Sequence, residues 1–289
     1  MNRLLFGDNQ FFGVNHMSEE KARAQSIRFQ DVSKIIEVLD AAYDEGVKTF
    51  MCTTHDKIAA VCDHVRANKA RYPDFVFYPC MPYAHKYANA LTEDGPMGAL
   101  KRFLPSDGLL DAALRGGASL AKKDVEGVAT LLIDAEMKMF EGLSTPVIFL
   151  QNVVVDLLLG LNFKEAFAIF ANHVRKKYKA EPGFITMNMP MLLDVLEEVG
   201  VKNPIVCANI NKIGFRMSGG FEAYEKALRE KEFQAIAMSV FASGAIPPKE
   251  AIEWVCAQPN VRSIVFGASS RGNIRNTRDL TLQYWPDAA

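Results

Sequence analysis

The chain has 289 residues and a net charge of −1, and hydrophobic residues make up 49% of it. This length and balance are typical of a globular protein with a large core, and the near-zero charge argues against nucleic acid or an anionic membrane as the main partner. Asp8 interrupts any early signal-peptide core, no apolar run approaches the roughly 20 residues that span a bilayer, and the five cysteines form no CxxC pair, so we expect a cytoplasmic protein with free thiols.

Short apolar runs alternate with longer segments of helical period along the chain. Eight runs that alternate with helices predict a parallel sheet closed into a (β/α)8 TIM barrel, as one domain over residues 1–289. The strands are expected at 4–7, 47–52, 75–80, 146–152, 183–188, 204–209, 234–240 and 263–268.

Helix signals fill the spaces between these runs. Asp31 is placed to cap a helix that ends near Gly46, and Asp124 is placed to cap another. Further helices are expected over 163–174 and 192–199, where apolar residues recur every three or four positions.

Residues 81–145 interrupt this alternation of strands and helices, because a usual connection between a strand and a helix is only a few residues long. The segment predicts a helical insertion between strands three and four. Two roles remain open for it: a lid over the catalytic face, or a peripheral decoration or oligomer contact.

Two stretches resemble the aldo-keto reductases. LLFGDNQFFG (4–13) is similar to the opening strand of that family. AIAMSVFASGAIPPKEAIEWVCAQPNVRSIVFGASSRGNIRNT (235–277) is similar to its last two barrel units, and weaker likeness extends over most of the chain outside 81–145. The resemblance implies a TIM barrel and an NADPH-dependent carbonyl reductase.

The catalytic Asp, Tyr, Lys and His of that family are not retained at the matching positions. The aspartate falls at Met51, the tyrosine near Asp56, the lysine at Cys80 and the histidine at Gln151 or Asn152. A reductase of this kind needs a proton donor held beside a cation. We therefore expect a degenerate site without the familiar reductase mechanism.

Residues that follow the strands of a parallel barrel are the candidates for chemistry. Histidine titrates near neutral pH and can act as general acid or base, with a carboxylate to orient it. No HxH or HExxH spacing indicates a metal site. The catalytic candidates are His16, His55, His85, Asp8 and Asp56.

The segment GASSRGNIR predicts an anion site, because free N–H groups and the helix dipole at a helix N-terminus favour phosphate. In the resembling family this segment holds the phosphates of the cofactor, which implies that role for Ser269, Ser270, Arg271 and Asn273. Asn188 matches the family's asparagine that binds the nicotinamide carboxamide. The alternatives are an ordinary helix cap with Arg271 on the surface, and a turn-forming Asn188.

Three functions remain open. The first is an enzyme of non-reductase class, a lyase or isomerase acting on a small anionic or phosphorylated metabolite. The second is an NAD(P)-binding divergent oxidoreductase or redox sensor, for which NADPH is the possible cofactor. The third is a non-catalytic interaction protein. Polar residues at the ends of the predicted strands favour an enzyme over an interaction protein. The sequence leaves the oligomeric state open.

Overall fold

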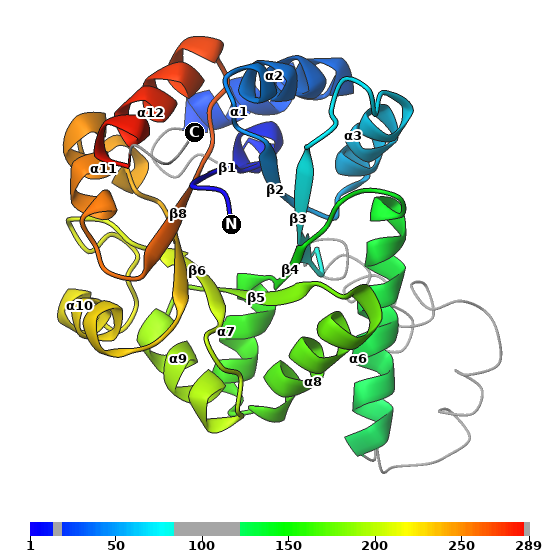
Figure 1. The fold of residues 1–289 in the computed structure, drawn as a ribbon, viewed down its shortest axis with the longest axis vertical. Coiled ribbons are helices and arrows are strands. Elements are labelled where there is room, and N and C mark those ends of the chain that lie inside the picture. Colours follow the sequence, from blue (N-terminus) through cyan, green and yellow to red (C-terminus); the bar gives the residue numbers. More distant parts are fainter. Residues whose placement is uncertain (14–18, 84–121, 286–289) are drawn as a thin grey trace.

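Parallel strands close into a barrel with helices around its outside (Figure 1). The structure is a computed structural model that describes residues 1–13, 19–83 and 122–285. Within these residues each strand pairs with its neighbours in chain order, and β8 closes the ring on β1, which confirms the predicted TIM barrel. The strands are β1 (Leu4–Phe6), β2 (Thr49–Thr53), β3 (Val76–Met81), β4 (Val147–Leu150), β5 (Glu181–Thr186), β6 (Ile205–Asn209), β7 (Gln234–Met238) and β8 (Val261–Phe266).

The helices follow the strands as the sequence indicates. Asp31 caps α2, and its side chain accepts a hydrogen bond of 2.9 Å from the Ser33 N–H. Gly46, directly after the helix, has the positive φ of +85° that favours glycine. The helices are α1 (Glu19–Arg28), α2 (Val32–Asp44), α3 (Asp56–Ala67), α6 (Lys122–Met137), α7 (Asn152–Gly160), α8 (Glu165–His173), α9 (Met189–Glu198), α10 (Phe221–Glu230), α11 (Pro248–Cys256) and α12 (Arg271–Tyr284).

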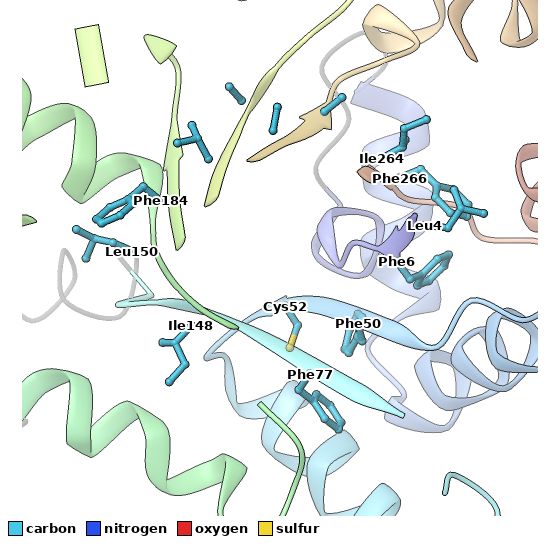
Figure 2. Packing of buried hydrophobic residues seen from close by; sticks show 14 of the residues in the cluster. Leu4, Phe6, Phe50, Cys52, Phe77, Ile148, Leu150, Phe184, Ile264 and Phe266 are labelled. Carbon is cyan, nitrogen blue, oxygen red and sulfur yellow. The ribbon is translucent and has the colours of Figure 1, made fainter. Parts of the chain in front are cut away.

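Two hydrophobic clusters follow from the alternation of side chains along each strand. Along β2, Phe50 and Cys52 belong to the outer cluster between strands and helices, whereas Met51 belongs to the inner cluster that fills the barrel. Figure 2 shows part of the outer cluster, with Phe50, Cys52 and Phe77 together. Burying one such aromatic side chain contributes about 1.5–3 kcal/mol, so this outer layer holds the helices to the sheet.

The predicted insertion over 81–145 is described only at its two ends. Its last part forms α6, which packs against α8 and β3; residues 84–121 lie outside the described part of the chain. The helix begins at Lys122, two residues before the predicted cap at Asp124. Whether the insertion is a lid or a peripheral element stays a prediction. The assignment of residues 1–289 to one domain also stays a prediction. No helix among the described residues is long and apolar enough to cross a membrane.

Candidate active site

A cavity of about 910 Å³ opens at the carboxyl ends of the strands, where barrel enzymes place their active sites. Its floor consists of inward-facing side chains of the inner cluster, and its wall consists of polar residues that end β2 or follow β1, β4, β7 and β8. The floor residues are Met51, Cys80, Ile185, Cys207, Met238 and Val265. The polar wall residues include Asp8, Asn9, Gln10, Thr53, Gln151, Asn152, Ser239, Ser243, Asn273, Asn276 and Thr277.

Asp8 is the ionisable carboxylate of this wall, and it is 6% exposed. Its Oδ2 accepts hydrogen bonds from the Thr53 N–H and from the Thr53 Oγ1, each 2.7 Å long. Burial raises the pKa of Asp8 above its ordinary value, and the two bonds from Thr53 oppose part of that rise. Both bonds from Thr53 fall on Oδ2, so they fix the orientation of the carboxylate at the cavity wall.

A second buried carboxylate, that of Glu136, binds the residue that follows Thr53. Glu136 of α6 is 4% exposed and accepts hydrogen bonds from the Thr54 Oγ1 and, at 3.4 Å, from the Tyr83 N–H. Thr54 directly follows Thr53, so two carboxylates hold consecutive residues at the end of β2. Sequence reasoning missed Glu136, because nothing in the local pattern of α6 distinguishes an inward-facing glutamate from a solvated one.

His55 and Asp56 do not join Asp8 in the cavity wall. The His55 Nδ1 accepts a hydrogen bond of 3.0 Å from the Lys57 N–H and so caps α3. Its ring packs 4.7 Å from Phe12 and 5.3 Å from Tyr83, measured between ring centroids. Asp56 is exposed in the first turn of α3. His55 and Asp56 therefore lie outside the cavity wall while Asp8 lines it, and the predicted catalytic role of the two stays a prediction.

His16 and His85, the other two histidine candidates, lie outside the described residues, and their catalytic role stays a prediction. The part of the chain that is described contains no group of three or more His, Cys, Asp or Glu side chains arranged to hold a metal ion. Two positions matched to the family's catalytic residues, Met51 and Cys80, lie on the cavity floor, and Gln151 and Asn152 lie on its wall.

The segment predicted to bind an anion leads into the first turn of α12. The Ser270 Oγ caps the helix by accepting a 3.4 Å hydrogen bond from the Asn273 N–H, and Asn273 lines the cavity. The Arg28 guanidinium donates to the Ser269 carbonyl oxygen at 3.0 Å. Of the predicted residues, Asn273 lines the cavity and Ser269, Ser270 and Arg271 do not, and the binding of an anion by this segment stays a prediction.

Arg271 binds a carboxylate of the chain itself. Its Nε donates to Oε1 of Glu45 at 2.7 Å, and Arg275 and Arg278 bind the same carboxylate at 2.8 and 2.6 Å. The hydrogen bonds from Arg275 and Arg271 lower the pKa of Glu45 to about 2. Because Glu45 is 4% exposed, a buried carboxylate rather than a phosphate attracts these cations.

Asn188 caps a helix in this structure. Its Oδ1 accepts a 3.3 Å hydrogen bond from the Met191 N–H at the start of α9, and Asn188 is not part of the cavity wall. The side chain thus follows the turn-forming alternative. The nicotinamide role expected for it from the family resemblance stays a prediction.

The segment after β7 also lines the cavity and has unusual backbone geometry. Ser239, Ala242 and Ser243 have φ values of 54°, 46° and 57°, in the left-handed region that favours glycine. Ser239 and Ser243 line the cavity. Strained backbone of this kind clusters at ligand-binding and catalytic sites.

Comparison with known proteins establishes the fold and no more. No protein-family model matches the chain, and no curated protein is similar to it in sequence. A protein of Pseudomonas aeruginosa assigned as an aldo-keto reductase superposes with a TM-score of 0.60 at 14% identity, over 98% of this chain and 90% of its own. An aldo-keto reductase from Bacillus halodurans, solved in its holo form, gives 0.52 at 11% identity, over 99% and 92%.

A third solved structure is a mutant of the protein Gox0644 in complex with NADPH. It gives a TM-score of 0.54 at 8% identity, over 97% of this chain and 83% of its own. These likenesses confirm the TIM barrel that the sequence predicted. At such low identity they establish no activity for this chain.

Proposed function

We propose that the chain is an enzyme that binds a small polar metabolite in the mouth cavity and moves a proton with Asp8, in a reaction of lyase or isomerase type. The observation that carries this proposal is Asp8 itself, a carboxylate on the cavity wall whose pKa is raised by burial. A general acid or base works best when its pKa lies near the working pH. Perturbed carboxylates in clefts are functional candidates for this reason.

The surroundings of Asp8 suit proton transfer to a bound molecule. Thr53 fixes the orientation of the carboxylate through both of its hydrogen bonds. The floor beneath it is apolar, so a reacting group there is removed from bulk water, which strengthens electrostatic interactions. An anionic group of the same metabolite would lie at the start of α12, near Asn273 and Ser270.

The test is solvent-deuterium incorporation, since an enzyme that adds or removes a proton at carbon exchanges that hydrogen with water. The purified protein is incubated in D2O with a panel of hydroxy, keto and phosphorylated metabolites, and incorporation is followed by NMR and mass spectrometry. We expect exchange in one metabolite class and a loss of about 10²- to 10⁴-fold in Asp8→Asn, the usual contribution of a general acid or base.

Asp63→Asn is the matched control, because Asp63 is an exposed carboxylate on α3 that pairs with Arg66 and lies outside the cavity wall. This variant is expected to exchange at the wild-type rate. Equal exchange in wild type and Asp8→Asn would remove Asp8 from the mechanism.

A second candidate function is the binding of an NAD(P)-type dinucleotide by a divergent oxidoreductase. The shape of the cavity favours this function. The cavity extends from the barrel floor to Asn273, Asn276 and Thr277 of α12, and it is also lined by the strained segment after β7. Two of the similar structures are in holo or NADPH-bound form. When bound, such a cofactor supplies hydride transfer; here Asn273 and Asn276 would hold its polar groups by hydrogen bonds.

Fluorescence titration with NADPH and NADH separates the two candidates. Asn273→Asp places a negative charge where cofactor phosphates would lie, at a helix N-terminus that tolerates a carboxylate. We expect about tenfold weaker binding from this repulsion. Gln283→Glu is the control, because it makes the same change at an exposed position in the last turn of α12. Absence of binding to both cofactors would remove the second candidate and leave the first.

A further inference from the structure

Glu136 joins three parts of the chain that are distant in sequence. It lies in the last turn of α6 and is 4% exposed. Its Oε2 accepts hydrogen bonds from the Thr54 hydroxyl, which follows β2, and from the Tyr83 N–H, which follows β3. Tyr83 and α6 belong to the two described ends of the insertion predicted over 81–145. One buried carboxylate therefore fastens both ends of the insertion to the carboxyl end of β2.

Thr54 is the residue through which Glu136 reaches the surroundings of Asp8. It is 0% exposed and lies between Thr53, the last residue of β2, and His55, the N-cap of α3. Thr53 lines the cavity and donates both of its hydrogen bonds to Asp8 at 2.7 Å. Side chains alternate along a strand, and accordingly Thr53 binds Asp8 at the cavity whereas Thr54 binds Glu136 of α6.

The connection between β2 and α3 is two residues long, and both residues are held. The Thr54 hydroxyl donates to Glu136, and the His55 Nδ1 accepts a hydrogen bond of 3.0 Å from the Lys57 N–H. Each residue has only two soft backbone dihedrals, so a connection this short cannot rearrange without moving Thr53. Hydrogen bonds weaken steeply as their angle departs from linearity. The bonds that Thr53 donates are therefore sensitive to how Thr54 is held.

We propose that Glu136 is a positioning residue for Asp8. By binding Thr54 it holds the end of β2 in the conformation in which both donors of Thr53 reach the Asp8 carboxylate. Glu136 does not line the cavity, so it acts through Thr54 and Thr53 and not by contact with a ligand. The inference rests on the proposed function, in which Asp8 moves the proton, and it links the predicted insertion to that group.

The acceptor oxygen and the negative charge of Glu136 have opposite effects on Asp8, and this makes the proposal testable. Both bonds from Thr53 lower the pKa of Asp8, so loosening them should raise that pKa. Removal of a nearby negative charge would lower it instead. Glu136→Gln removes the charge and keeps an acceptor oxygen for Thr54, whereas Glu136→Leu removes both. We therefore expect the pKa of Asp8 to rise in Glu136→Leu and to stay unchanged in Glu136→Gln.

Helix α6 supplies a matched control in Asp134, two positions before Glu136. Residues two apart on a helix point about 200° away from each other, since one turn takes 3.6 residues. Asp134 accepts hydrogen bonds from the Lys177 Nζ and the Tyr178 hydroxyl, both 2.6 Å long. These partners follow α8, which packs against α6. Asp134→Leu therefore loosens α6 on its other side and leaves the acceptor for Thr54 in place.

The experiment is NMR spectroscopy of the full chain labelled with ¹³C at its aspartate carboxyl groups and with ¹⁵N at its amides. It measures the pKa of Asp8 and the hydrogen-exchange rate of the Thr53 amide. In Glu136→Leu we expect the pKa to rise and the exchange to become about tenfold faster, a coupling usual within one hydrogen-bond network. Glu136→Gln and Asp134→Leu should match the wild type in both quantities. With a metabolite that is turned over, Glu136→Leu should lower kcat and leave KM unchanged.

Each outcome decides the proposal. Wild-type values in Glu136→Leu would overturn it, and so would an equal change in Asp134→Leu. A lower pKa of Asp8 in Glu136→Gln would mean that Glu136 acts by its charge, which also contradicts the proposal. If Glu136→Leu does not fold, as judged by its circular dichroism, Thr54→Val decides, because it removes the same hydrogen bond from the other partner; Thr54→Ser should restore wild-type values.

The two NMR readouts need no turnover, so they separate this proposal from the proposed function. A protein in which Glu136→Leu raises the pKa of Asp8 but which exchanges no metabolite hydrogen would refute proton transfer by Asp8 and leave the link from Glu136 to Asp8 intact. Metabolite exchange that depends on Asp8, with wild-type NMR values in Glu136→Leu, would refute the positioning role alone.

Discussion

Oδ2 of Asp8 accepts both the backbone N–H and the hydroxyl of Thr53 at 2.7 Å, across the boundary between β1 and β2. This arrangement fixes the orientation of a buried carboxylate that lines the cavity. Burial of Asp8 at the carboxyl ends of the strands costs free energy when its carboxylate is ionised. The cost is understandable if Asp8 takes part in chemistry.

Replacing Asp8 with Asn is expected to stabilise the fold at neutral pH. The folded-state pKa of Asp8 is raised above its ordinary value of 3.8, so the wild-type protein loses stability as the pH rises from about 4 through the folded pKa. The amide carries no such penalty and can still accept a hydrogen bond from Thr53. Chemical unfolding at pH 4 and pH 8 checks this, and an Asp8→Asn advantage that is the same at both would contradict it.

Thr53→Val is expected to shift the ionisation of Asp8 upward. The Thr53 hydroxyl lowers the pKa of Asp8, and its removal leaves the backbone N–H groups of residues 53 and 8 as the hydrogen bonds that lower this pKa. The acid limb of the rate profile, or the ¹³C shift of the Asp8 carboxyl, should therefore move to higher pH. Thr186→Val is the control, because it removes a similar bond from Thr186 to Asp156, and it should leave the Asp8 titration unchanged.

Glu45→Gln is expected to weaken the fold at neutral pH and to have little effect in strong acid. Its pKa is lowered to about 2 from 4.5 by hydrogen bonds from Arg275 and Arg271. The stabilisation is present above pH 4.5 and is lost as the pH falls towards 2. Thermal unfolding at pH 7 and pH 2 measures the difference. Glu198→Gln, which breaks an exposed pair with Lys164, should change little at either pH.

Gly183→Ala tests the packing of the barrel interior. A Cβ at Gly183 would lie 2.3 Å from Cε1 of the Phe149 ring, and overpacking of this kind costs about 1–3 kcal/mol. The smaller side chain of Phe149→Leu should recover part of that loss in the double variant, as measured by urea unfolding. Gly160→Ala has nothing within 4 Å and should not destabilise the fold.

Much of the fold was predictable because its signals are local. The apolar runs placed every strand within about two residues of its observed bounds, and Asp31 and Gly46 marked the ends of α2 correctly. Strand β5 begins at Glu181, two residues before the predicted start. The reason is that its pairing with β4 extends to Pro182 and Glu181, which hydrophobic pattern alone does not indicate.

The site was less predictable, because its contacts join distant parts of the chain. Arg271 pairs with Glu45 across 226 positions, and Glu136 meets Thr54 across 82. The sequence around GASSRGNIR does not indicate that Arg271 binds the buried carboxylate of Glu45. His55 was placed correctly after a strand, but whether such a residue faces the cavity or caps the next helix depends on backbone geometry that the sequence pattern does not contain.

The most direct test of the account is solvent-deuterium incorporation by the wild-type protein and by Asp8→Asn, measured on the same metabolite panel. The account predicts incorporation into one class of metabolite by the wild type and a loss of about 10²-fold or more in the variant, as for a general acid or base. Incorporation at the same rate in both proteins would contradict it. In that case the carboxylate at the barrel mouth would have no part in proton transfer.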